Sequence, residues 1–129
     1  MILTLPWPPS VNTYWRHPTR GALAGRHLIS EDGRRYRSAV GAIIMSERHA
    51  VGLQSRLRVV IRACPPDARR RDLDNLPKGL LDAIQHAGVY ADDSQIDDLR
   101  IVRGPVVPGG QVVVDIWPVE PSRAALSDF

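Results

Sequence analysis

The stretch ARRRDLDNLPKGLLDAIQHAGVYADDSQIDD, from Ala68 to Asp98, contains three arginines, a helical pattern and two acidic segments. Seven of the chain's fourteen acidic residues lie between Asp72 and Asp98, although the protein has a formal net charge of +3. Lys78, the only lysine of the chain, lies in the same stretch. Because neighbouring carboxylates repel one another unless a positive charge lies between them, this pattern indicates a cation site.

The centre of the stretch predicts a helix from Asn75 to Ala87, with Asp74 as its N-cap and Gly88 at its end. Pro77 is compatible with this helix because it falls in the first turn. The apolar side chains that form the expected buried stripe are Leu76, Leu80, Leu81, Ile84 and Ala87.

Upstream of this stretch the pattern predicts two strands and a second helix. A short strand is expected over Ile2–Leu5, and apolar and arginine residues alternate over Leu57–Ala63, as in a strand with one buried face. A helix is expected from Glu31 to Ala50, with Ser30 as its N-cap and Gly52 as its stop.

Downstream, a strand that begins over Leu99–Ile101 and a second over Val112–Ile116 flank a Pro108-Gly109-Gly110 turn and are expected to pair as a hairpin. The order of elements is strand, helix, strand, helix, strand, strand. It predicts a single α+β domain in which two helices pack on a mixed four-stranded sheet. We place this domain at residues 1–120 and a C-terminal tail at residues 121–129.

Composition narrows the class of protein. The 129 residues are 43% hydrophobic and 24% charged, as expected for one globular domain. Cys64 is the only cysteine, which excludes an intramolecular disulfide and a cysteine-rich zinc site. No apolar run reaches the roughly 20 residues of a membrane helix, and the N-terminus lacks a signal-peptide pattern, so we expect a cytoplasmic protein. The pI of about 9.6 suits a polyanionic partner.

The segment from Trp7 to Arg37 is rich in loops and basic residues. Tyr14, Trp15 and Arg16 form a group that can stack on bases and pair with the backbone of a nucleic acid. The alternative is that Trp7 and Trp15 pack beneath the loop as part of the core.

The acidic residues indicate metal-assisted phosphodiester hydrolysis. Mg²⁺ prefers oxygen ligands and keeps several waters, so two or three aspartates suffice for a site. Arginines and Lys78 would then bind the phosphate, while the ion polarises a phosphoryl oxygen and lowers the pKa of a bound water.

Each part of this pattern also has a structural interpretation. Asp74, Lys78 and Asp82 have the i, i+4 spacing of a solvated salt-bridge ladder. In the structural interpretation, Asp72 or Asp74 caps the helix and has no other role. A further alternative is an exposed turn formed by Asp92, Asp93, Asp97 and Asp98. A calcium loop is excluded, because Pro77 occupies the position that requires glycine.

The chain resembles the RusA-type Holliday junction resolvases, a family of crossover junction endodeoxyribonucleases, in an ordered set of segments. These segments are LPWPPSVNTYWR, Glu31 to Tyr36, DLDN-x-x-K, the Asp-Asp pair and the closing hairpin. The resemblance runs from about Leu3 to Glu120. It departs from the family in a longer loop around HPTRGALAGRH and in the tail after Glu120.

The resemblance implies a homodimer that binds four-way junction DNA and nicks opposing strands with Mg²⁺ or Mn²⁺. The family's catalytic and metal-binding acids fall on Asp72, Asp74 and Asp93, with Asp92 as a further metal candidate, and its essential lysine falls on Lys78. The candidate DNA-binding residues are Arg69, Arg70, Arg71, Arg16, Tyr14 and Trp15.

Geometry raises one difficulty, because a helix from Asn75 to Ala87 is about 20 Å long and Asp93 follows its far end. Six extended residues, at about 3.3 Å each, can just bring Asp93 back to the first acids. The alternative is that a second copy of the chain supplies part of each site. Our hypothesis is the second, with Lys78 as the residue that acts in trans. Two other functions stay open at this point: a non-catalytic protein that binds branched DNA, and a structural or regulatory phage protein.

Overall fold

The main sheet of the computed structural model has four strands in the order β1-β6-β4-β5. The strands are β1 (Ile2–Pro6), β4 (Leu57–Cys64), β5 (Ile96–Arg103) and β6 (Gln111–Pro118). Pairs β1–β6 and β4–β6 are antiparallel, whereas β4–β5 is parallel. This confirms the expected mixed four-stranded sheet. The structure describes residues 1–119, so the tail predicted at residues 121–129 lies outside the described residues.

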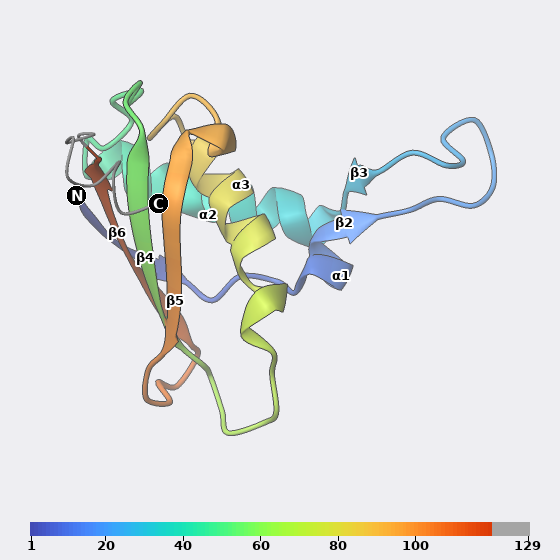
Figure 1. Ribbon diagram of the computed structural model, residues 1–129. Coiled ribbons are helices and arrows are strands. Elements are labelled where there is room, and N and C mark those ends of the chain that lie inside the picture. Colours follow the sequence, from blue (N-terminus) through green and yellow to red (C-terminus); the bar gives the residue numbers. More distant parts are fainter. Residues whose placement is uncertain (120–129) are drawn as a thin grey trace.

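The helices lie on one face of this sheet (Figure 1). They are α2 (Glu31–Ser46) and α3 (Pro77–His86), with the short 3₁₀ turns η1 (Leu73–Asn75) and η2 (Asp93–Gln95) at either end of α3. The alternation predicted for β4 is confirmed, because Val59 and Ile61 are buried beneath the helices. The core is therefore a two-layer α+β core.

A small ribbon projects from the body of the protein (Figure 1). After α1 (Val11–Tyr14), β2 (Trp15–Arg16) pairs antiparallel with β3 (Leu28–Ile29), and residues 17–27 form the loop between them. We call residues 15–29 the arm. The sequence predicted only a basic loop here, because two-residue strands are too short to give a periodic pattern.

The predicted pairing of the last two strands is wrong. β5 and β6 are not neighbours, because β4 lies between them and pairs with both. Parallel strands require a long crossover, and α3 makes that crossover from β4 to β5. The chain then passes to the other side of β4 to form β6.

Two predicted helix ends also differ from the structure. Asp74 lies inside η1 rather than at an N-cap, and α3 begins at Pro77, whose fixed φ suits the first turn of a helix. The helix predicted to reach Ala50 ends at Ser46, and Arg48 follows with a positive φ of 60°. Such a left-handed residue ends a helix before the predicted Gly52.

Tyr14 joins the arm to α3. Its side chain is fully buried, and a Cβ placed on Gly79 would lie 2.7 Å from Cδ2 of the Tyr14 ring. The hydroxyl of Tyr14 donates a hydrogen bond to Asp82 on the next turn of α3. Glycine at position 79 therefore allows the ring to pack directly on the helix backbone.

We predict that Gly79→Ala destabilises the protein, because a methyl group at this position overlaps the Tyr14 ring. Overpacking of this kind costs about 1–3 kcal/mol. Gly41→Ala is the matched control: Gly41 also lies within a helix, but a Cβ there would meet nothing within 4 Å. This change should stabilise the protein by about 0.5–1 kcal/mol. Urea denaturation measures both changes, and an equal gain from both would contradict the packing.

Candidate active site

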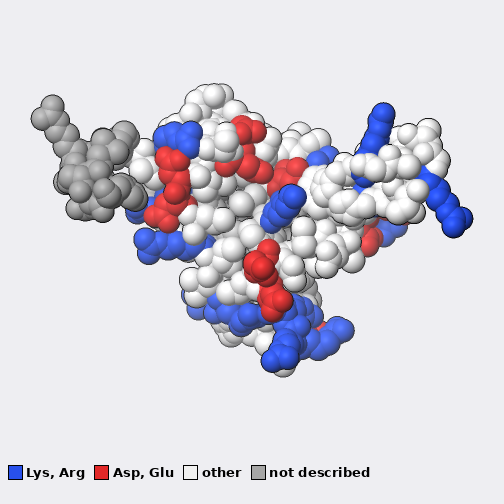
Figure 2. Space-filling view, turned by 45° about the vertical axis from the view of Figure 1, so that its right-hand side comes forward, with Lys and Arg blue, Asp and Glu red and all other residues white. Residues whose placement is uncertain are grey.

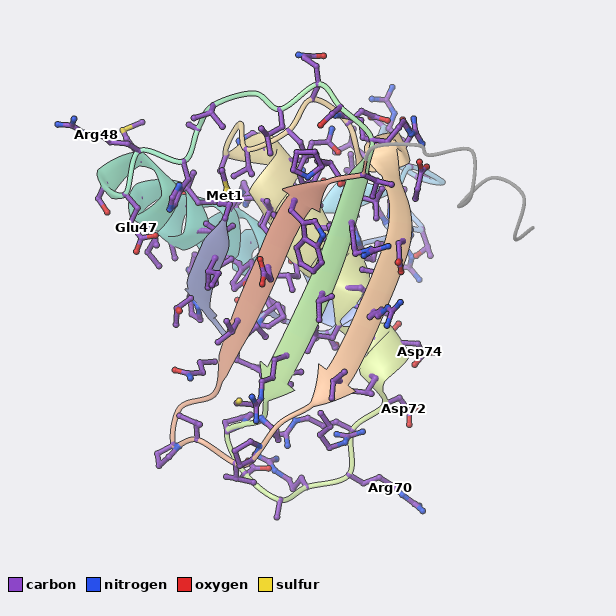
Figure 3. All side chains as sticks on the ribbon, turned by 60° about the vertical axis from the view of Figure 1, so that its left-hand side comes forward. Met1, Glu47, Arg48, Arg70, Asp72 and Asp74 are labelled. Carbon is purple, nitrogen blue, oxygen red and sulfur yellow. The ribbon has the colours of Figure 1, made fainter. Side chains whose placement is uncertain are left out.

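Asp72 and Asp74 lie at η1. The loop that leaves β4 leads to this turn, and the turn lies close to the C-terminal end of β5. Asp72 occupies the N-cap position, but its side chain makes no capping hydrogen bond. Both side chains point away from the sheet (Figure 3). Arg103 of β5 fixes the loop, because its Nη2 donates to the carbonyl oxygen of Arg71 at 2.9 Å. The capping interpretation of Asp72 is therefore not what the structure shows.

A pocket of about 420 Å³ lies beside Asp72. One wall is the segment Trp7–Ser10, and the other comes from Arg70, Arg71 and the start of α3 at Asn75 and Leu76. The guanidinium of Arg71 lies over the Trp7 ring at 5.9 Å. A carboxylate and two arginines thus share one open cavity, which suits a phosphate group with a bound cation.

Lys78 lies in the first turn of α3, one turn after Asp74. The alternative interpretation as a salt-bridge ladder does not hold, because Asp82 pairs instead with Arg37, whose Nε lies 2.8 Å from Oδ2. Lys78 makes no ion pair with any residue of 1–119, and its Nζ lies 6.0 Å from the centre of the Trp15 ring. Its charge is therefore available to an external anion.

Asp93 is held by a buried tyrosine. The hydroxyl of Tyr90 donates to Oδ1 of Asp93 at 2.6 Å, and the backbone N–H of Asp93 donates to the side chain of Gln85 at 3.1 Å. Its neighbour Asp92 caps η2 by accepting from the N–H of Ser94 at 3.0 Å. Asp92 therefore has a structural role, whereas Asp93 has one oxygen bound to Tyr90 and the other directed away from that bond.

The environment of Asp93 opposes its ionisation. Partial burial raises the pKa of this carboxyl, the hydrogen bond from Tyr90 lowers it, and the negative charges of Asp82 and Asp92 raise it further. The net pKa is raised above the ordinary value of 3.8. A nearby cation would relieve this repulsion.

The candidate acids lie at opposite ends of α3. Asp72 and Asp74 precede the helix, and Asp93 follows it in η2, as the positions of the two 3₁₀ turns show (Figure 1). Within residues 1–119 of the chain, no three His, Cys, Asp or Glu side chains are placed to hold one metal ion. A single chain therefore presents an Asp72–Asp74 pair and a separate Asp93.

The candidate acids Asp72, Asp74 and Asp93 differ from most other acidic residues in their ion pairing. Across residues 1–119, most carboxylates have a basic partner within 4.0 Å. The carboxylates without one are Asp72, Asp74, Asp92, Asp93 and Asp115. Four of these five are the residues that the sequence selected as metal ligands. Exposed, unpaired carboxylate oxygens fit a hard divalent cation that keeps several waters.

The candidate DNA-binding residues fall into two groups. Arg70 and Arg16 are exposed and form no ion pair within residues 1–119, whereas Arg69 and Arg71 both pair with Asp67. Basic and acidic areas lie side by side on this face (Figure 2).

Two of the aromatic candidates have structural contacts instead. Tyr14 is fully buried, so its ring cannot stack on a base, and the expectation that it contacts DNA is corrected. Trp15 packs against the core, as the alternative interpretation expected. Tyr90 was missed altogether, although its position three residues before Asp93 is a signal for such a contact.

A small α+β domain that presents carboxylates without ion pairs beside a lysine and arginines has the features of enzymes that act on phosphodiesters. A family profile for endodeoxyribonuclease RusA matches residues 6–116. The chain belongs to this family.

Named relatives agree with the profile. The crossover junction endodeoxyribonuclease rusA of Enterobacteria phage HK97 is 48% identical over 116 residues, which cover 90% of this chain and 92% of the relative. Crossover junction endodeoxyribonuclease RusA of Escherichia coli strain K12 is 43% identical over 114 residues, or 88% and 91% of the two chains. The protein of the same name from Enterobacteria phage 82 is 44% identical over 114 residues. No helix within residues 1–119 is long and apolar enough to span a membrane.

We predict that the ionised carboxylate of Asp93 destabilises the folded protein at neutral pH. Because its folded pKa is raised, its contribution to stability is fully present below pH 3.8 and is lost as the pH rises through the folded pKa. Asp93→Asn should therefore keep or raise the melting temperature at pH 7, since the amide oxygen can still accept from Tyr90.

Asp97→Asn is the control with the opposite sign. A hydrogen bond from Arg56 lowers the pKa of Asp97, so its contribution is present above pH 3.8 and is lost as the pH falls through the folded pKa. Melting temperatures between pH 3 and pH 7 measure both variants. A larger loss at pH 7 for Asp93→Asn than for Asp97→Asn would contradict the assignment.

Proposed function

We propose that this protein is a crossover junction endodeoxyribonuclease that hydrolyses phosphodiester bonds of four-way junction DNA with a divalent cation, Mg²⁺ or Mn²⁺. Membership of the RusA family and the names of the relatives support the reaction. The observation that supports the metal dependence is that Asp72, Asp74 and Asp93 form no ion pair within residues 1–119, although the chain has sixteen arginines.

Each residue has a role that follows from its surroundings. Asp72 and Asp74 would hold the cation together with Asp93, and the bound ion would polarise the scissile phosphate and lower the pKa of a water. Lys78 donates hydrogen bonds to the phosphate and stabilises the charge that develops on it. Arg70 binds a phosphate that flanks the cleaved bond.

We further propose that the active form is a homodimer in which each site combines residues of two chains. Lys78 belongs to the same end of α3 as Asp74, so the residue that acts in trans is Asp93 of the partner subunit rather than Lys78. This arrangement accounts for the separation of the acids within one protomer. It also places two sites in one particle, as the cleavage of opposing strands requires.

Nicking of a labelled four-way junction tests the activity. In Mg²⁺ the native protein should make paired, symmetric nicks that are absent in EDTA and on a linear duplex. Loss of a group that merely orients a metal ligand costs about 10–100-fold, so Asp72→Asn should reduce the rate by about 100-fold or more. Asp115→Asn is the matched control, because Asp115 is also unpaired but lies on the sheet strand β6. Tight junction binding without nicks would leave a non-catalytic DNA-binding protein.

Mixed dimers test the shared site. Asp72→Asn and Asp93→Asn subunits are each expected to be inactive alone, whereas their mixture should regain one functional site per dimer and nick one strand. Asp72→Asn mixed with Asp74→Asn should regain none, because both changes affect the same end of α3. Absence of activity in the first mixture would show that each site belongs to a single chain.

A further inference from the structure

The arm, residues 15–29, has a charge pattern unlike that of the rest of the chain. No acidic residue occurs between Trp15 and Ser30, while Arg16, Arg20 and Arg26 fall within it. None of these three arginines makes an ion pair with any residue of 1–119, a property that they share with Arg48 and Arg70 of the body. The arm therefore presents positive charge that nothing in the described chain satisfies.

The outer end of the arm projects away from the rest of the described chain (Figure 1). Residues 19–27 are all exposed, and basic side chains lie at the outer part of the arm (Figure 2). The tip is nevertheless folded, since the N–H of Gly25 donates to the carbonyl oxygen of Pro18 at 2.9 Å. Gly21 and Gly25 both have a φ near +80°, which glycine adopts without strain. The segment is exposed and folded, and its charged residues are all basic. Such a segment contributes little to the core and is suited to binding an anionic partner.

The root of the arm is fixed to α3. Ser30 closes it by donating from Oγ to the carbonyl oxygen of Tyr14 at 2.8 Å, and its own N–H donates to the same oxygen at 2.9 Å. The Tyr14 ring is in turn buried against Gly79, and its hydroxyl donates a hydrogen bond to Asp82. The direction of the arm is therefore set by the helix that carries Lys78.

A stack of aromatic rings joins the arm to Lys78. The Trp15 and His27 ring centres are 4.7 Å apart, those of His27 and His17 are 4.5 Å apart, and Nζ of Lys78 lies over Trp15. Desolvation of the His27 ring lowers its pKa, and the neighbouring groups His17 and Lys78 lower it further. This shift favours the neutral imidazole, so the permanent charge of the arm comes from its arginines.

We infer that the arm binds the phosphate backbone of the duplex next to the cleaved strand, through Arg20 and Arg26. This inference rests on the proposed function, because the arm begins beside Lys78. Five or six extended residues on each side of the loop reach at most about 20 Å. That upper limit is roughly half a helical turn of B-DNA, whose full turn is about 34 Å, so the phosphates within reach are those of the duplex next to the cleavage site.

Salt dependence of junction binding tests the inference. Affinity is measured by fluorescence anisotropy in EDTA at several salt concentrations for native protein, the double variant Arg20→Gln/Arg26→Gln and the control Arg48→Gln. The slope of log K against log salt changes by about 0.9 for each phosphate contact. The double variant should therefore lose about 1.8 from the slope per protomer. Arg48, which also lacks an ion pair within residues 1–119, lies far from Asp72 and Asp74 (Figure 3), so its variant should keep the native slope.

Equal slopes for all three proteins would overturn the inference. A second measurement locates the arm directly. Thr19→Cys gives one accessible thiol, because Cys64 is buried, and an iron chelate attached there should cut the duplex next to the nicking site. Cutting at no defined position would also overturn the inference.

Both experiments are done without Mg²⁺ and read binding rather than hydrolysis. If the protein does not nick junctions, the proposed function fails while the slope still tests the arm. If nicking is normal and the slope is unchanged, only the arm inference fails.

Discussion

The parallel pairing of β4 with β5 is the constraint on which the rest of the molecule depends. Two parallel neighbours cannot be joined by a tight turn, so the chain must cross the sheet, and α3 makes that crossing. The loop before α3 carries Asp72 and Asp74, and the turn after it carries Asp93. The same helix holds Lys78 and supports the arm through Gly79. One crossover therefore sets the positions of the candidate catalytic groups and of the basic surface around them.

Ion pairing then separates structural charges from functional ones. On the body of the protein, Asp67, Asp82, Asp97 and Asp98 each accept from at least one arginine, and these contacts fasten loops and neighbouring strands. The acids on either side of α3 have no such partner among residues 1–119, and the arginines of the arm have none either. Partial burial is the main cause of the raised pKa of Asp93, and the nearby negative charges of Asp82 and Asp92 add to it. In the proposed function, a divalent cation would satisfy the acids and a phosphate backbone would satisfy the arginines.

Much of the fold could be predicted from local sequence patterns. The remainder depends on contacts between residues that are distant in the sequence. The alternation in β4 and the apolar stripe of α3 could be predicted, because both depend only on neighbours in the chain. The position of β6 could not, since the hydrogen bonds that place it beside β4 join residues more than forty positions apart. Tyr14 resembled a DNA-stacking residue because it adjoins Trp15 and Arg16, but its burial depends on Gly79, which is remote in sequence. The acids were found from composition and order, whereas their separation by α3 became evident only in three dimensions.

Direct measurement of cation binding tests the central claim, which is that the unpaired acids around α3 hold a divalent metal. Mn²⁺ binding to the DNA-free protein can be followed by electron paramagnetic resonance, in which bound Mn²⁺ loses the signal of the free ion. We predict saturable binding to the native protein and to Asp115→Asn, and its loss in Asp72→Asn and in Asp93→Asn. Equal Mn²⁺ binding by all four proteins would contradict the account, because the ion would then occupy a site that these carboxylates do not form.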